Sequence, residues 1–295
     1  IGNTPIQLRK KNNIRTIQAS LAIEGNTLTI EQITYILEGK RVLGPKKDIL
    51  EVKNALDLYQ DLSQFNPLSI KDFLSAHYLL MKKLVSDAGK WRISGVGIFK
   101  GKAVAHLPPP ADRVSGLMTD LFQFLKNKAE IPWLLKACIF HYELEFIHPF
   151  TDGNGRMGRL WQQLLLMKED KVFEYLPVEE IIRKNQKKYY ETLGLCDREG
   201  ESTKFIEFSL KQILIALQQY SKNAPLHVKD PLARLAYASQ NLYQKWFSRK
   251  TYLELHKEIS GATASRDLQE GLEKKLLEKK GEKNQTLYRF LKLIS

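Results

Sequence analysis

The sequence predicts a mostly α-helical protein with one short β-hairpin and a separate small domain at the C-terminal end. Apolar residues recur at helical spacing through most of residues 1–222. Residues 95–106 place strand-forming residues on either side of a Lys-Gly-Lys turn, which is typical of a hairpin. Residues 223–230 hold few periodic apolar residues, contain Pro225 and precede Pro231, which indicates a linker to residues 231–295.

The composition is that of a globular protein with a basic charge balance. The chain has 295 residues, 43% of them hydrophobic, and a formal net charge of +13; this length suffices for two domains. The basic balance is compatible with nucleic acid, an anionic surface or simple solubility. Two cysteines, Cys138 and Cys196, argue against a disulfide scaffold and suit a reducing compartment. No apolar stretch approaches the length of a membrane span, so we expect a cytoplasmic protein without membrane contact.

The first helix is expected to end near residue 24. Ser20 and Glu24 are spaced i, i+4 and therefore face the same way. Gly25-Asn26 follows, and both residue types accept the left-handed conformation that ends helices. A capping box at Thr29 and Gln32 predicts the start of a second helix. Spacing alone indicates an ordinary amphipathic helix with a solvated glutamate.

Residues 148–159 carry the most chemistry and read His-Pro-Phe-Thr-Asp-Gly-Asn-Gly-Arg-Met-Gly-Arg. The Gly153-Asn154-Gly155 turn can point successive N–H groups inward and bind an anion. The turn leads into the N-terminus of a helix, a position that favours the binding of phosphate. Arg156 and Arg159 are spaced i, i+3 on that helix, and their guanidinium groups suit phosphate oxygens.

Two further residues of this stretch suit phosphate chemistry. Asp152 supplies a hard oxygen of the kind that Mg²⁺ prefers, with phosphates and waters completing the coordination shell. His148 belongs to the residue type that titrates near physiological pH and can accept a hydroxyl proton. Taken singly, the histidine would be a satisfied core residue and the arginines a solvated helix face. Their combination indicates a nucleotide-handling site.

This stretch matches the pattern His-x-Phe-x-Asp/Glu-Gly-Asn-Gly-Arg-x-x-Arg at all eight specified positions, so the chain resembles the Fic (filamentation induced by cAMP) family. The resemblance implies a Mg²⁺-dependent transferase with a helical core. Most members move AMP from ATP onto a Ser, Thr or Tyr hydroxyl of a protein. The resemblance implies His148 as general base and Asp152 as the Mg²⁺ ligand. It also implies that ATP is held by Gly153, Asn154, Gly155, Arg156, Gly158 and Arg159.

The N-terminal helix matches a second pattern of this family, Ser/Thr-x-x-x-Glu-Gly/Asn. The resemblance therefore places the chain in the group with an N-terminal inhibitory helix. It implies that Ser20 and Glu24 are the inhibitory residues. Glu24 would pair with Arg159 and block a productive pose of ATP.

Two further regions resemble parts of the family that surround the nucleotide. Residues 95–106 resemble the flap hairpin, whose edge would dock the target protein by strand addition near His148; the alternative is a surface hairpin without a partner. The flap residues that would cover the nucleotide are Ile98, Phe99, Lys100 and Gly101. Residues 185–193 resemble the helix that borders the adenine, with Tyr189 as ligand and Asp197 where relatives often carry Asn. Alternatively, the tyrosine packs between helices.

The C-terminal domain is expected to contain helices at residues 231–247, 251–258 and 263–278, a turn at 279–284 and a strand at 285–290. This order resembles a winged helix-turn-helix domain. Ser265, Arg266 and Gln269 would then face a major groove of DNA, and the lysine-rich turn would contact phosphate. A protein partner is the alternative to DNA, because the third helix also carries glutamates.

The expected function is an autoinhibited protein adenylyltransferase that uses ATP and Mg²⁺, with Glu24 as the inhibitory residue. Three alternatives stay open. Glu24 could instead align a water so that the site removes AMP, or the donor could be another nucleotide. In a different class, the chain could be a DNA-binding regulator whose Fic fold senses ATP, although the intact His148 argues against this.

Overall fold

The computed structural model describes residues 6–100, 103–127, 131–223, 231–256, 259–282 and 285–292. Internal contacts divide the chain into two compact units, one containing Pro5–Tyr220 and the other Ser221–Ser295. Most of the expected linker, residues 224–230, lies outside the described residues. None of the described helices combines the length and the apolar composition that crossing a membrane requires.

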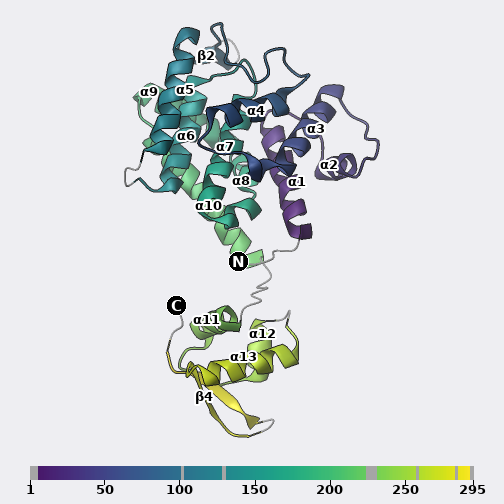
Figure 1. Ribbon diagram of the computed structural model, residues 1–295, viewed down its shortest axis with the longest axis vertical. Helices are drawn as coiled ribbons and strands as arrows, with labels where there is room; N and C mark the ends of the chain where they lie inside the picture. The colour runs from purple at the N-terminus through teal and green to yellow at the C-terminus, as the bar shows by residue number, and fades with distance from the viewer. Residues whose placement is uncertain are drawn as a thin grey trace. The chain divides into compact units, whose positions relative to one another are not determined.

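The first unit consists of helices with one β-hairpin in the part that the structure describes (Figure 1). The expectation of a mostly helical fold is thereby confirmed. The helices before the hairpin are α1 (Ile6–Ile23), α2 (Ile30–Leu37), α3 (Lys46–Gln60), the 3-10 helix η1 (Leu62–Gln64) and α4 (Ile70–Met81). Those after it are α5 (Ala111–Lys126), α6 (Trp133–Ile147), α7 (Asn154–Glu169), the 3-10 helix η2 (Lys171–Tyr175), α8 (Val178–Lys184), α9 (Gln186–Glu199) and α10 (Thr203–Asn223).

An aromatic core holds α6 and α7 together with α4. Trp161 of α7 is fully buried, meets Phe73 edge-on at 4.9 Å between ring centroids, and donates its Nε1–H to the Pro67 carbonyl at 3.0 Å. Phe150, in the loop between α6 and α7, stacks on Phe73 at 5.5 Å. Removing one such buried ring costs roughly 3–5 kcal/mol. The core therefore fixes the loop that carries residues 148–153.

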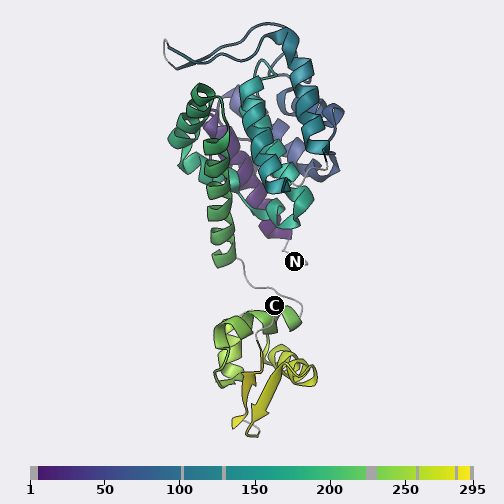
Figure 2. The same cartoon turned by 90° about the vertical axis from the view of Figure 1, so that its left-hand side faces the viewer.

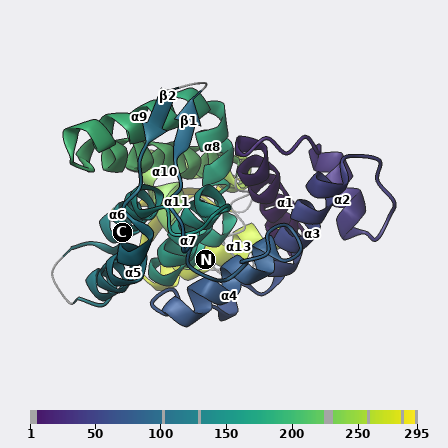
Figure 3. The same cartoon turned by 90° about the horizontal axis from the view of Figure 1, so that it is seen from above.

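Helix α1 is an internal element although it stands near the N-terminus. It packs against α3 and α8, as Figure 3 shows, and Ile17 is 1% exposed. Its buried polar side chains are paired with distant groups. Gln18 donates to the Leu28 carbonyl at 3.2 Å, and Arg183 donates to Gln18 Oε1 at 2.6 Å. The helix is therefore anchored from several sides and is not a surface helix with one apolar face.

The chain leaves α1 through a turn whose geometry was predictable. Gly25 has a φ of +91°, a conformation that suits glycine. Thr29 Oγ1 then accepts from the Gln32 N–H at 3.2 Å, and Gln32 Oε1 accepts from the Thr29 N–H at 2.9 Å. This reciprocal pair confirms the expected capping box. The turn leaves Glu24 one position beyond the end of α1.

The hairpin consists of β1 (Ile98–Lys100) and β2 (Ala103–His106), which pair antiparallel with an irregularity between Ile98 and Phe99. Both strands fall within the hairpin expected at residues 95–106. Figure 2 shows it reaching out from one end of the helical unit, and β2 contacts α9. Gly101, at the expected turn, lies outside the described residues.

The second unit combines three helices with a small sheet in the residues that the structure describes between 231 and 292. Its elements are α11 (Pro231–Leu242), β3 (Phe247–Ser248), α12 (Arg249–Leu255), α13 (Gly261–Glu273), β4 (Leu277–Lys280) and β5 (Leu287–Phe290). The strands form an antiparallel sheet in the order β3-β5-β4. Phe247 stacks on Phe290 at 5.3 Å between ring centroids, which joins the sheet to a core of its own.

All three helices of this unit end earlier than the periodicity predicted. The first ends at Leu242, the second at Leu255 and the third at Glu273, and residues 279–280, expected in a turn, belong to β4. Gln244 and Lys275 adopt φ values of 62° and 54°, which interrupt helical hydrogen bonding. The strand β3, which follows Gln244, and the strand β4, which follows Lys275, both pair with β5. Sheet pairing therefore outweighs the helical periodicity at both places.

A buried ion pair generates a prediction for this unit. Arg234 of α11 and Asp267 of α13 are 4% and 1% exposed, and Arg234 donates to both carboxylate oxygens. Arg234→Met should destabilise the unit by roughly 3–5 kcal/mol, because it leaves a buried carboxylate uncompensated. Native-state hydrogen exchange of the α13 amides measures this loss.

Arg249→Met is the matched control for that experiment. Arg249 is exposed and donates to Ser265 Oγ at 2.9 Å. Its replacement should change the protection of the same amides by less than about 0.5 kcal/mol, as is usual for surface positions. Equal effects of the two substitutions would contradict the importance of the buried pair.

Candidate active site

The loop between α6 and α7 begins at His148 in a left-handed backbone conformation. His148 ends α6 with a φ of 51° and donates its backbone N–H to the Leu144 carbonyl at 2.9 Å. Positive φ is unfavourable for residues with a side chain. Arg92 stabilises this turn, since its Nε donates to the His148 carbonyl at 2.8 Å and its Nη2 to the Ile147 carbonyl at 3.3 Å. The guanidinium thus neutralises the negative end of α6 and fixes the loop.

His77 of α4 supports the same loop. Its ring stacks on Phe150 at 3.5 Å between centroids, with 4° between the planes. His77 Nε2 donates to the Asp152 carbonyl at 3.0 Å, and Nδ1 accepts from the Gly89 N–H at 2.8 Å. One donor and one acceptor define a neutral ring, and burial lowers the pKa of His77 to about 4.

The glycine-containing turn is closed by the side chain of Asn154. Its Oδ1 accepts from the Phe150 N–H and its Nδ2 donates to the Phe150 carbonyl, both at 2.9 Å. Gly153 has a φ of +90°, and a Cβ there would lie 2.9 Å from Met81 Sδ, so the position requires glycine. Helix α7 starts at Asn154, and its first N–H groups have no partners within the helix. The turn has the geometry of an anion-binding helix N-terminus.

The carboxylate of Glu24 lies over the first turn of α7. A Cβ at Gly155 would be 2.5 Å from Glu24 Oε1 and 3.1 Å from Arg159 Nη1. Only glycine lets this carboxylate approach so closely. Gly158 faces α6 instead, since a Cβ there would be 2.7 Å from His141 Cδ2. The structure thus gives Gly158 a role in helix packing.

Arg159 joins α7 to the end of α1. Its Nε donates to Ser20 Oγ at 3.1 Å, and its Nη2 donates to the Ser20 carbonyl at 3.0 Å and to Glu24 Oε1 at 2.7 Å. The Arg159 side chain is fully buried, whereas that of Glu24 is 31% exposed. Burial alone would lower the pKa of Arg159, but the Glu24 carboxylate outweighs burial and the pKa is raised. The third guanidinium nitrogen, Nη1, is buried without a partner.

Arg156 is held by two carboxylates beside the turn. It is 4% exposed and donates to Glu51 Oε1 at 3.1 Å and to Asp152 Oδ1 at 2.9 Å. Asp152 Oδ1 also accepts from the Gly153 N–H at 2.6 Å, and the Asp152 side chain is 47% exposed. The described residues contain no cluster of three or more metal-ligating side chains. A Mg²⁺ ion here would therefore need phosphate and water oxygens in addition to Asp152.

The imidazole of His148 is suited to accept a proton. Burial lowers the pKa of His148, and the nearby Glu145 opposes this only in part. Within the described part of the chain, its buried Nδ1 has no hydrogen-bond partner. The ring is therefore neutral at pH 7, and a neutral imidazole has one basic nitrogen.

The two residues expected near the adenine lie in polar networks of the protein itself. Tyr189 is 1% exposed, and its hydroxyl donates to Glu145 Oε1 at 3.3 Å. Asp197 accepts from the Tyr142 hydroxyl at 3.2 Å and lies 2.8 Å from His106 Nδ1. The role of Tyr189 and Asp197 at the adenine stays a prediction.

His106, at the end of β2, fastens the hairpin to the helices. Its Nδ1 faces Asp197 Oδ2 and its Nε2 faces the Phe146 carbonyl, each at 2.8 Å. Both partners are acceptors, so the ring satisfies them together only as an imidazolium. Burial would lower the pKa of His106, but these two acceptors outweigh burial and the pKa is raised. The other expected flap residues have side chains outside the described part of the chain: Ile98, Phe99 and Lys100.

No local sequence pattern pointed to several of the residues that build this site. Glu51 lies 105 residues before Arg156, and His77 lies 75 residues before Asp152. The i, i+4 spacing of Lys47 and Glu51 would have marked the glutamate as part of a surface pair. Only tertiary structure brings these partners to the loop.

The neutral state of His77 predicts a pH-dependent stability. Its pKa is about 4 in the folded protein and near 6.5 in an unfolded chain, so the unfolded chain binds more protons between these values. The unfolding free energy should therefore fall as the pH is lowered from 6.5 towards 4, by about 2 kcal/mol at pH 5 from this residue. Urea unfolding at pH 7.5 and pH 5 measures the fall.

His77→Gln is the comparison protein, since Gln keeps a donor for the Asp152 carbonyl but does not titrate. The variant should lose about 2 kcal/mol less than wild type between the two pH values. Parallel losses in the two proteins would contradict a neutral, buried His77.

Comparisons with known proteins agree with this geometry. The model of the Fic/DOC family matches residues 67–166. A crystal structure of a Fic family protein from Desulfovibrio desulfuricans G20 is 41% identical, covers 97% of this chain and 88% of that chain, and gives a TM-score of 0.72. "Protein adenylyltransferase Fic" of Drosophila erecta is 30% identical over 273 residues, which are 86% of this chain and 52% of that protein. Its namesake in Nematostella vectensis is 32% identical over 211 residues, 68% of this chain and 46% of that protein.

The chain thus spans about half the length of these curated relatives. The Desulfovibrio protein, in contrast, matches along nearly the whole of both chains. With the family model on residues 67–166 and the loop geometry described above, this match shows that the chain belongs to the Fic/DOC family.

Proposed function

We propose that the chain is a protein adenylyltransferase, which moves AMP from ATP to a Ser, Thr or Tyr hydroxyl and is inhibited by its own helix α1. The curated relatives are named for this activity. The observation that carries the proposal is the Arg159–Glu24 pair, 2.7 Å long, over the first turn of α7. It puts a carboxylate where a helix N-terminus would favour phosphate.

His148 acts as the general base in this proposal. Its neutral ring accepts the proton of the target hydroxyl while the hydroxyl oxygen bonds to the α-phosphorus of ATP. The bond from that phosphorus to the α,β-bridging oxygen breaks, and pyrophosphate leaves. The N–H groups at the start of α7 and the guanidinium of Arg156 hold the phosphates and offset the developing charge. The protein contributes positioning and charge, without a covalent intermediate.

Asp152 would hold a Mg²⁺ ion together with the phosphates of ATP. When bound, the ion offsets phosphate charge and orients the leaving group. A single carboxylate, half exposed and oriented by Arg156 and the Gly153 N–H, suits a metal that keeps phosphate and water oxygens.

Glu24 inhibits by occupying the Arg159 guanidinium, which ATP needs for its γ-phosphate. The γ-phosphate and the Glu24 carboxylate are both anions that the Arg159 guanidinium can bind, so they compete for it. The carboxylate also takes the space directly above Gly155. Activation therefore requires Glu24 to leave Arg159, either alone or with the end of α1.

The target segment would dock on the hairpin. In the described part of the chain, β1 and β2 form a sheet of their own, and each has an outer edge that can accept a further strand. His106 ties this hairpin to Asp197 of α9, which would keep a docked hydroxyl in a fixed place relative to His148.

The same groups would support removal of AMP. The partly exposed Glu24 carboxylate can orient a water against an AMP-modified hydroxyl. Self-modified Glu24→Gly protein carrying labelled AMP is the substrate that tests this. Release of AMP by added wild-type chain would support the reverse reaction, and retention of the label would contradict it.

His148→Ala should retain ATP binding and lose transfer. The base touches the hydroxyl proton, whereas the phosphates are held by α7 and the arginines. Loss of a general base lowers the rate by about 10²–10⁴-fold. Calorimetric ATP titration and labelled self-modification measure the two properties, and transfer near the wild-type rate would refute the assignment.

Glu24→Gly should raise self-modification, because it frees Arg159 for the γ-phosphate. Glu24→Gly combined with Arg159→Ala should not, because the clamp is then missing. Glu38→Gly is the matched control: Glu38 is an exposed glutamate that follows the end of α2. Labelled ATP and gel autoradiography compare the four proteins. An unchanged rate in Glu24→Gly would leave α1 a purely structural helix.

We also propose that the second unit is a winged-helix domain that binds DNA. Helices α11–α13 and the sheet β3-β5-β4 have the corresponding order. Arg266 and Gln269 are exposed on α13, and Lys279 is exposed on β4. Glu273, exposed on the same helix, opposes DNA and favours the alternative of a protein partner.

Salt dependence tests the DNA proposal. The full chain should bind random duplex DNA with a log–log salt slope near −0.9 per phosphate neutralised. Lys279→Ala should flatten that slope, and Arg266→Ala should chiefly relax sequence preference. Titrations at two salt concentrations measure both effects. Absence of a complex at low salt would leave only the protein-partner alternative.

A further inference from the structure

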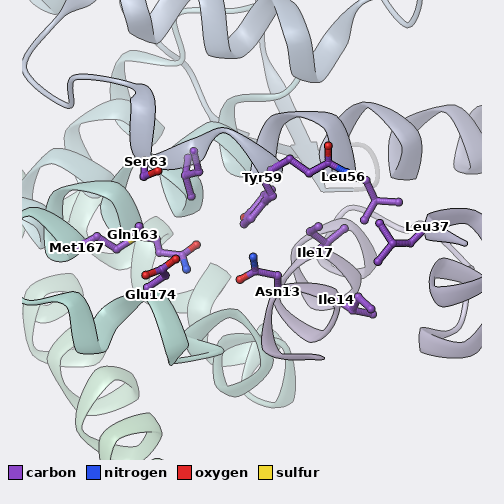
Figure 4. Close-up of a pocket in the computed structure, with 12 residues that line it drawn as sticks. Asn13, Ile14, Ile17, Leu37, Leu56, Tyr59, Ser63, Gln163, Met167 and Glu174 are labelled. Atoms are coloured by element: carbon purple, nitrogen blue, oxygen red, sulfur yellow. The ribbon is translucent and has the colours of Figure 1, made fainter. Parts of the chain in front are cut away.

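A cavity of 360 Å³ lies beside the N-terminal part of α1, between that helix, α3 and α7 (Figure 4). No residue proposed above for ATP, metal or target binding lines it. Its volume falls in the range of small-molecule sites, about 300–1,000 Å³. Its apolar walls come from five elements, α1, α2, α3, η1 and α7, and consist of Ile14, Ile17, Leu37, Leu56, Leu62 and Met167.

Polar groups converge on this space from three of those helices. Figure 4 shows the side chains of Asn13, Tyr59 and Gln163 pointing into it. Gln163 is 7% exposed, and its buried Oε1 has no hydrogen-bond partner among the residues that the structure describes. A buried acceptor without a donor is unfavourable. A ligand that donates a hydrogen bond to Oε1 would satisfy it.

The charge of the lining restricts the ligand further. Glu174 contributes a carboxylate, and the lining residues that the structure describes include no Lys or Arg. A phosphate or carboxylate ligand would lose its hydration here without gaining a cationic partner. The lining instead suits a neutral molecule with an apolar body and one donor group.

We propose that this cavity binds such a neutral molecule, and that its occupation strengthens the inhibition by Glu24. The second part rests on the proposed function. Helix α1 supplies one wall of the cavity through Ile14 and Ile17, and Glu24 follows the end of the same helix. Ile17 and Glu24 are roughly 10 Å apart along the axis, at about 1.5 Å per residue. A ligand that needs α1 in place favours the docked helix by mass action and keeps Glu24 on Arg159.

Three probes that share an ethylphenyl body test the binding site in the full chain. para-Ethylphenol carries the donor, ethylbenzene lacks it, and para-ethylbenzoate carries an anion. Methyl NMR should show para-ethylphenol shifting the signals of Ile14, Ile17 and Met167. Ethylbenzene should bind roughly threefold to tenfold more weakly for want of one hydrogen bond, and para-ethylbenzoate more weakly still.

Two substitutions separate the cavity from the rest of the surface. Ser63 is exposed and lines the mouth of the cavity, so Ser63→Trp should block binding. Ser115→Trp, at an exposed position on α5, is the control and should leave binding unchanged. Gln163→Leu should abolish the preference for para-ethylphenol over ethylbenzene. Absence of binding by all three probes, or equal binding to the Ser63→Trp protein, would contradict the binding site and show that the cavity is a packing defect.

Labelled self-modification tests the coupling. At ten times its dissociation constant, para-ethylphenol should slow wild-type self-modification by up to roughly tenfold, and should not affect Glu24→Gly. An unchanged wild-type rate despite observed binding would overturn the coupling and leave the binding site. A Glu24→Gly rate equal to wild type would instead overturn the proposed inhibition and the coupling with it, since NMR detects binding without activity.

Discussion

The fully buried guanidinium of Arg159 is the constraint on which the rest of the site depends. A charge without water must be paired, and removing a partner from a buried pair is strongly destabilising. Ser20 and Glu24 supply its partners in this structure, so the end of α1 satisfies the arginine of α7 as long as no other anion does. This pairing explains why an N-terminal helix is packed into the centre of the unit. In the function that we propose, the same pairing keeps the arginine from a phosphate.

The loop before α7 is rigid for a related reason. Arg92 holds the carbonyl of His148, neutral His77 holds the carbonyl of Asp152, and Asn154 closes the loop onto Phe150. Chemistry that relies on positioning benefits from groups that are fixed before the substrate arrives. The loop is already arranged while the Glu24 carboxylate lies over Gly155. The inhibition that we propose would therefore act on nucleotide binding rather than on the arrangement of this loop.

Local rules were sufficient for part of this architecture. The i, i+4 spacing put Ser20 and Glu24 on one side of α1, and the Thr29 capping box marked the next helix, because both depend on neighbours in the chain. Local rules could not predict the partners of the loop before α7, because Glu51, His77 and Arg92 contact this region only through tertiary structure. The predicted helix ends in the second unit were wrong where strand pairing with β5 outweighed the helical periodicity of the sequence. Asp197, expected at the adenine, is paired with His106, an interaction that no spacing predicts.

The central claim is that Glu24 and the γ-phosphate compete for Arg159. Calorimetric titration with ATP and with ADP tests it most directly, because ADP lacks the γ-phosphate. The titrations should use His148→Ala protein, which prevents turnover, with and without Glu24→Gly. If the claim is right, removing Glu24 strengthens ATP binding more than ADP binding. An equal gain for the two nucleotides would contradict it.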